Sequence, residues 1–239
     1  MIPLISISWD KKATFLKRPN RFIGICKIED EKEPVEVHIK DPGRLKELLY
    51  PGNKVLLKRA DNKNRKTKWD LIAASSGDLK SWILVNSGYH SQIAKKLLTF
   101  NDISPFREIR EVRPEIKVKN SRLDFLITLK NDDKIYIEVK GCTLEREGRA
   151  LFPDAPTIRG CRHLNELLDV VKEGDGAAIF FLIFCPNVDC FSVNKDTDKK
   201  FYEVFNQIIK SDIGIYCFLL EYREDGMVYF KQLLPLCRD

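Results

Sequence analysis

Three ionisable residues stand at spacings that could support hydrolytic chemistry. Asp124 lies in the apolar segment SRLDFLI, and Glu138 and Lys140 follow in YIEVK after the turn NDDK. Side chains two residues apart on a strand project from the same face, about 6 to 7 Å apart. If the two segments pair as a hairpin, Asp124 reaches that face too. The spacing therefore predicts two carboxylates and one ammonium group at a shared position.

Such a group is suited to phosphodiester hydrolysis. Two carboxylates can hold one Mg²⁺ or Mn²⁺ and leave positions for water and a substrate phosphate. The cation polarises the phosphate and lowers the pKa of a bound water, while a lysine stabilises or helps deprotonate the nucleophile. We expect Asp124, Glu138 and Lys140 to be catalytic, with Asp124 and Glu138 as metal ligands. The alternative is a surface ion pair, because Glu-x-Lys is common on exposed strand faces.

The residues around Glu138 and Lys140 favour the catalytic interpretation. Ile135, Ile137 and Val139 would fill the opposite face of the strand, and Gly141 interrupts the pattern. The charged face would then end beside loops through which a substrate could enter.

A second informative segment is LFPDAPTIRGCRHLNEL at residues 151–167. Its prolines predict an extended path, and Thr157 is a plausible helix N-cap. Arg159, Arg162 and His163 would then stand in the first helical turns, where phosphates are attracted. The alternative is a turn at Asp154 and a histidine that is simply satisfied within the core. His38 and His90 have no partner at metal-ligand spacing, and we assign them no role.

The positive charge is concentrated in one segment. The whole chain carries a formal net charge of +6, and the segment 53–68 holds seven basic residues against Asp61, so that seven minus one accounts for all of it. A concentrated basic segment suits a polyanion, although a solvated hairpin loop is the alternative. Since no recognition helix is evident, we expect contacts to phosphates without reading of base identity. The residues that we expect to bind DNA are Lys58, Arg59, Arg65, Lys66, Lys68, Arg122, Arg159 and His163.

The elements that must position these residues divide the chain near residue 80. Residues 1–80 alternate apolar and polar residues over 5–9, 21–29, 35–40, 54–60 and 68–75, and a short helix is expected over 43–50. Five short strands with one small helix predict an oligonucleotide-binding-type β-barrel. Residues 81–239 predict helices over 90–100, 162–174 and 198–211 among strands, including an apolar strand over 177–185 that is buried on both faces. This order predicts an α/β domain with a mixed sheet.

Composition limits the class and the location of the protein. The 239 residues are 44% hydrophobic and 32% charged, as in an ordinary globular protein. The seven cysteines are scattered without a CxxC pair, which predicts buried thiols in a reducing compartment and no disulfide framework; Cys185 and Cys190 as a redox pair is the alternative. No apolar run approaches the ~18 residues of a membrane span, and the charged start is unlike a signal peptide. We expect a cytoplasmic protein without a membrane partner, and no oligomeric state follows from the sequence.

Several segments resemble the sugar fermentation stimulation protein A family. They are HIKDPGRLKELLYPG, SRLDFLI, IEVKGCTL and, most specifically, LFPDAPTIRGCRHLNEL. The resemblance implies a DNA-binding protein with an oligonucleotide-binding-type barrel and a domain resembling the PD-(D/E)xK nucleases. Asp124 takes the first acidic position of that motif, and Glu138 and Lys140 take the paired positions. The stretch CPNVDCFSVN departs from the family pattern, with Asp189 and Phe191 as the remaining matches.

The sequence thus leads to one main hypothesis and two others. The first is a DNA-binding protein, for single strands as well as duplex, with a nuclease centre that uses Mg²⁺ or Mn²⁺. The second is a non-catalytic transcriptional regulator linked to sugar metabolism that retains the nuclease fold. The third is a sugar-linked metabolic enzyme, for which no glycine-rich cofactor loop or nucleophile elbow is present.

Overall fold

The computed structural model describes residues 1–62, 64–76, 81–119 and 121–238. The N-terminal part is a five-stranded barrel, in which each strand pairs with two neighbours in the cyclic order β2, β3, β4, β6, β5. All of these pairs are antiparallel except β4 with β6. The strands are β2 (Lys11–Asn20), β3 (Ile23–Ile28), β4 (Val35–His38), β5 (Lys54–Arg59) and β6 (Trp69–Ser75). Closure leaves the barrel without free edges, and Phe15, Cys26 and Val55 fill its interior.

The C-terminal part is an α/β sandwich around a mixed sheet. Its strands run in the order β8, β9, β10, β13, β15, β16, with β10, β13 and β15 parallel to one another. They are β8 (Ile109–Val118), β9 (Ser121–Leu129), β10 (Lys134–Cys142), β13 (Gly176–Ile183), β15 (Gly214–Tyr222) and β16 (Met227–Leu234). A separate small sheet contains β11 (Leu144–Arg146), β12 (Arg149–Phe152) and β14 (Cys190–Val193).

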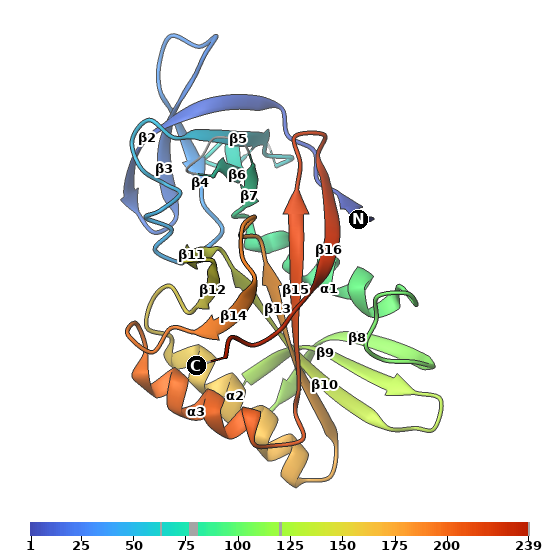
Figure 1. Ribbon diagram of the computed structural model, residues 1–239. Coiled ribbons are helices and arrows are strands. Elements are labelled where there is room, and N and C mark those ends of the chain that lie inside the picture. Colours follow the sequence, from blue (N-terminus) through green and yellow to red (C-terminus); the bar gives the residue numbers. More distant parts are fainter. Residues whose placement is uncertain (63, 77–80, 120, 239) are drawn as a thin grey trace.

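Helices cover both faces of the mixed sheet. Helix α1 (His90–Thr99), preceded by the short η1 (Ser87–Tyr89), packs on the face that carries Phe180. Helices α2 (Ile158–Lys172) and α3 (Lys199–Ile209) lie side by side on the other face, with Phe181 beneath them (Figure 1). Strand β13 is buried on both faces, as its apolar run predicted.

The two parts share one continuous sheet. Strand β7 (Trp82–Leu84) pairs with β6 of the barrel and with β15 of the sandwich. Strand β1 (Ile2–Ser6) pairs with β16 at the other end of the chain. The predicted division at residue 80 falls among residues 77–80, which lie outside the described part of the chain.

Two local predictions for the barrel are wrong. The first strand belongs to the mixed sheet through β16, and its place in the barrel is taken by β2, whose many lysines obscured the buried Ala13 and Phe15. Residues 43–50 form turns and no helix, because Leu45 has a φ of +48° and a side chain elsewhere in the chain binds its backbone N–H. The leucines of this segment are nevertheless buried.

The prediction for the cysteines is wrong for two of the seven. Cys190 and Cys237 form a disulfide, which joins β14 to the C-terminal residues. The pairing was hidden in the sequence because the two residues are 47 positions apart. The other five cysteines are buried free thiols, and Cys185 is not bonded to Cys190.

None of the described helices is both long enough and apolar enough to cross a membrane.

Candidate functional site

The site forms where two paired strands separate. Strands β9 and β10 pair from Lys134 opposite Thr128 to Ile137 opposite Phe125, and the ladder stops there. Beyond this point β10 follows β13 and β9 follows β8. The carboxylate of Asp124 occupies the fork and accepts a hydrogen bond from the backbone N–H of Val139 at 2.7 Å. The structure therefore places Asp124 beside Glu138 and Lys140.

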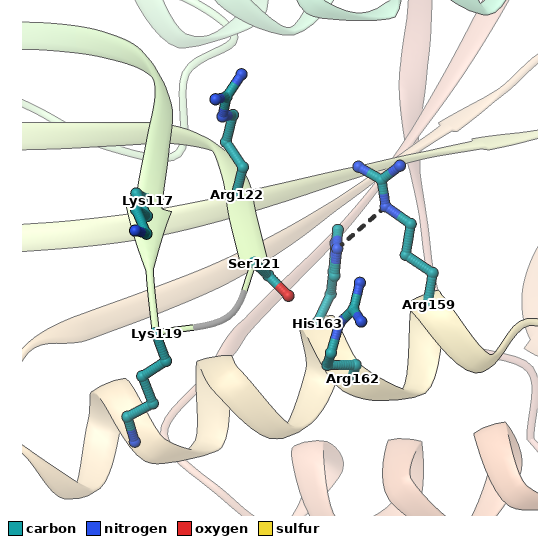
Figure 2. A pocket seen from close by; sticks show the side chains of 7 residues that line it. All are labelled: Lys117, Lys119, Ser121, Arg122, Arg159, Arg162 and His163. Atoms are coloured by element: carbon teal, nitrogen blue, oxygen red, sulfur yellow. Dashed lines mark hydrogen bonds between the residues drawn. The ribbon is translucent and has the colours of Figure 1, made fainter.

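Glu138 is held by two side chains in the interior. It is only 2% exposed, and its Oε1 accepts hydrogen bonds from the Lys140 ammonium and from His163 Nδ1, the latter at 2.5 Å. Arg159 Nε donates to His163 Nε2 at 3.2 Å, as Figure 2 shows. Since Nε2 accepts, the imidazole proton lies on Nδ1, where it is donated to Glu138. Helix α2 thus fixes both the tautomer of His163 and the orientation of Glu138.

Both carboxylates are ionised at neutral pH. Burial, with the charge of Glu138 as a second cause, raises the pKa of Asp124 from 3.8 to about 6. Burial by itself would raise the pKa of Glu138, but Lys140 and His163 outweigh it and hold that pKa below its usual value. Two like charges therefore face each other in a mostly buried position, an arrangement that a cation would stabilise.

The oxygen set fits a divalent cation that keeps water ligands. Glu138 Oε2 is buried and has no hydrogen-bond partner among the described residues. Together with Asp124 it offers hard anionic oxygens of the kind that Mg²⁺ and Mn²⁺ prefer. In the described part of the chain, no group of three or more His, Cys, Asp and Glu residues is arranged to hold a metal ion. An ion held by Asp124 and Glu138 would complete its shell with further oxygen ligands, such as those of water or substrate.

A buried histidine supports the strand behind the site. His90, to which the sequence assigned no role, packs directly on Gly141, where a Cβ would lie 2.1 Å from its Cε1 atom. The ring also stacks on Phe184, and burial lowers the pKa of His90 to about 4, so that it is neutral. Glycine after Lys140 is therefore required by packing.

The segment before α2 ties the site to the barrel. Thr157 is the N-cap, as predicted, and its hydroxyl accepts from Gly160 N at 3.0 Å. Asp154 does more than form a turn, because its Oδ2 accepts from the backbone N–H groups of Arg44 at 2.7 Å and Leu45 at 3.3 Å. The loop of the barrel around Arg44 is thereby fixed beside the start of α2.

A basic pocket of about 500 Å³ adjoins the site between the end of the β8–β9 hairpin and the first turns of α2 (Figure 2). It brings together Arg122, Arg159 and His163, which were expected to bind DNA, and Arg162, whose position at the helix start was noted. It also contains Lys117, Lys119 and Ser121, which the sequence analysis missed. The feature of the sequence that could have identified them is the positive charge near the end of the hairpin, but nothing in the sequence shows that this end lies beside α2.

The five expected DNA-binding residues of the barrel do not line this pocket. Lys58 and Arg59 lie on β5, and the other three follow in the connection to β6, in the upper part of Figure 1. Arg65 forms a bidentate ion pair with Asp70, with distances of 3.2 and 2.7 Å. Lys63, counted in the charge of this segment, lies outside the described residues. The binding role of the barrel segment stays a prediction.

Comparisons with known proteins match the two parts of the chain separately. Residues 16–85 match the family described as SfsA N-terminal OB domain, and residues 88–226 match the sugar fermentation stimulation protein RE domain. Together with the barrel and the mixed sheet, these matches confirm the predicted architecture, an oligonucleotide-binding-type barrel followed by an α/β domain with a mixed sheet.

Relatives and a solved structure match over nearly the full length. A sugar fermentation stimulation protein homolog from Methanococcoides burtonii is 42% identical over 240 residues, covering 99% of this chain and 96% of the relative. The homolog from Thermosipho melanesiensis is 41% identical and covers 100% of both chains. The structure of Pyrococcus furiosus SfsA in complex with Ca²⁺ is 25% identical, with a TM-score of 0.91 over 100% of both chains.

Proposed function

This chain belongs to the sugar fermentation stimulation protein family, and we propose that it binds DNA and hydrolyses phosphodiester bonds at a divalent-metal centre formed by Asp124, Glu138 and Lys140. The proposal rests mainly on Oε2 of the buried Glu138, which has no hydrogen-bond partner among the described residues and lies beside the Asp124 carboxylate. A buried acceptor without a partner costs free energy, which a bound Mg²⁺ or Mn²⁺ would offset.

The side chains of this chain have separable roles in the proposed reaction. Lys140 and His163 hold Oε1 of Glu138 and leave Oε2 without a partner among the described residues, so that it can accept a ligand. Asp124 is oriented by the N–H of Val139. The Lys140 ammonium is available to stabilise the negative charge that develops on the phosphate. The cation, when bound, would polarise the phosphate and lower the pKa of a water nucleophile.

Independent considerations support the ligand and the partner. The Pyrococcus furiosus relative is described in complex with Ca²⁺, which like Mg²⁺ is a hard cation that takes oxygen ligands. Oligonucleotide-binding-type barrels commonly bind nucleic acids, and the basic segment of this one suits phosphate contacts. We expect binding of single-stranded as well as duplex DNA without sequence preference, since no recognition helix is evident among the described helices.

Cleavage assays test the catalytic part of the proposal. Plasmid and single-stranded DNA are incubated with the protein in Mg²⁺, in Mn²⁺ and in EDTA. We expect cleavage only with the metals, and a loss of about 10² or more in rate for Lys140→Ala, since lysine stabilises developing charge. Lys134→Ala, an exposed lysine at the far end of the same strand, is the matched control. Absence of cleavage on every substrate would refute the catalytic assignment.

One observation favours a second candidate, a DNA-binding regulator without catalysis. Both Lys140 and His163 occupy Oε1 of Glu138, so that only one oxygen of this carboxylate remains for a metal ion. If the protein is a regulator of this kind, the Asp124→Ala variant should bind DNA with the same affinity as the wild type. Its thermal midpoint would also be unaffected by Mn²⁺, whereas a metal centre would be stabilised by its ion.

A further inference from the structure

The basic pocket beside the site carries positive charge that the protein does not neutralise. Its five basic side chains are Lys117, Lys119, Arg122, Arg159 and Arg162. Carboxylates hold two of them, because Lys119 pairs with Asp169 and Glu173 and Arg122 pairs with Glu115. The other three have no carboxylate partner among the described residues, and no acidic residue lines the pocket. The pocket is therefore suited to an anion.

A buried hydroxyl provides a second, independent sign of a ligand. Ser121 is only 9% exposed, and its Oγ has no hydrogen-bond partner in the described part of the chain. Figure 2 shows this hydroxyl pointing from β9 toward α2. A buried hydroxyl without a partner costs free energy, which an acceptor oxygen in the pocket would offset.

The side chains that line the pocket are suited to bind a phosphate. Arginine guanidinium groups donate in a planar fork that matches two oxygens of one phosphate, and a serine hydroxyl can donate to a third. Arg159 and Arg162 lie in the first two turns of α2, where the backbone dipole also favours an anion. Lys117 reaches the pocket from the opposite wall, on β8.

One side chain connects the pocket to the proposed metal centre. His163 lines the pocket and also donates to Glu138. Any phosphate in the pocket would therefore lie next to the phosphate that is being cleaved and could belong to the same strand.

We propose that this pocket is a phosphate-binding subsite that holds a second phosphate of the polynucleotide, separate from the scissile one. The inference rests on the proposed function for its substrate, although the pocket itself is defined without reference to catalysis. Two sources share this chemistry, a terminal phosphate at the end of a strand and an internal diester phosphate.

Binding measured without cleavage tests the subsite. Fluorescein-labelled single-stranded oligonucleotides with a 5′-phosphate, a 3′-phosphate or no terminal phosphate are titrated in EDTA. The test variant is Lys117→Gln with Arg162→Gln, since both residues are exposed and their loss should leave the fold intact. The matched control is Lys172→Gln with Lys199→Gln, two exposed lysines on α2 and α3 that do not line the pocket.

We expect the test variant to weaken binding by about tenfold or more and to lower the salt slope by about 1.4, which is two contacts at about 0.7 each. Ser121→Ala should weaken binding by about threefold to tenfold without lowering the thermal midpoint, because it removes an unpartnered hydroxyl. If the wild type prefers one phosphorylated end and the test variant does not, the source is terminal. Equal loss for all three oligonucleotides identifies an internal phosphate.

Binding by the test variant equal to that of the control would overturn the subsite, even if the protein cleaves DNA. Conversely, a binding loss confined to the test variant together with no metal-dependent cleavage would retain the subsite and reject the nuclease centre. The two proposals therefore fail in different experiments.

Discussion

Replacing Asp124 with asparagine should remove a charge that the metal-free fold accommodates poorly. The pKa of Asp124 is raised to about 6 by burial and by the charge of Glu138. A carboxyl group whose pKa is raised on folding stabilises the folded state while the group is protonated. For Asp124 this contribution is complete below the unfolded pKa of 3.8 and is lost as the pH rises through about 6. The difference between about 6 and 3.8, at about 1.4 kcal/mol per pKa unit, amounts to about 3 kcal/mol.

Urea unfolding in EDTA between pH 4 and pH 8 measures this effect. Asparagine can still accept the hydrogen bond of Val139, so the stability of Asp124→Asn relative to wild type should rise by about 2 kcal/mol across this range, because part of the total is already lost at pH 4. Asp132→Asn, an exposed carboxylate in the turn between the same strands, is the control. A pH-independent difference would refute the conclusion that Asp124 is partly buried beside an ionised Glu138. At pH 8, Mn²⁺ at 100 times its Kd should add about 2.7 kcal/mol to the wild type and less to the variant.

Three further outcomes are expected. His163→Ala removes a hydrogen bond to a buried carboxylate and should lower the free energy of unfolding by about 2 to 3 kcal/mol, and by less in a Glu138→Gln background; equal losses in both backgrounds would contradict the pairing. Exchanging Lys58, Arg59 and Lys66 together for glutamine should reduce the salt slope of DNA binding by about 2 to 3, whereas an unaltered slope would move the binding face elsewhere. Replacing Cys190 and Cys237 with serine opens a link across 47 residues and should cost up to about 4 kcal/mol in urea unfolding, and no loss would mean that the link does not constrain the unfolded chain.

The pairing of Glu138 with Lys140 could be read from the sequence because it depends only on local geometry. The period of two along a strand puts both side chains on one face, and Ile137 on the other face enters the core. The turn after β9 then makes the two strands neighbours, so Asp124 had to lie close by. The N-cap at Thr157 was also predictable, since capping uses residues three positions apart.

Other features depend on contacts between distant parts of the chain. The ladder between β9 and β10 ends at Phe125 because β9 continues along β8 and β10 along β13, and no local pattern encodes this separation. The turns at Leu45 likewise depend on Asp154, 109 residues away. Lys117, Lys119 and Ser121 were missed, and residues 43–50 were assigned to a helix, because their environment is set by contacts with distant parts of the chain.

By itself the sequence determined which side chains could do chemistry and on which strand face Glu138 and Lys140 stand, because strand periodicity and capping act over a few residues. Only the tertiary structure shows that His163 forms a hydrogen bond with Glu138, and that the end of the β8–β9 hairpin lies beside α2 and forms a basic pocket with it. These arrangements arise from packing helices onto a sheet, and the free energy of that packing is shared among residues far apart in the chain.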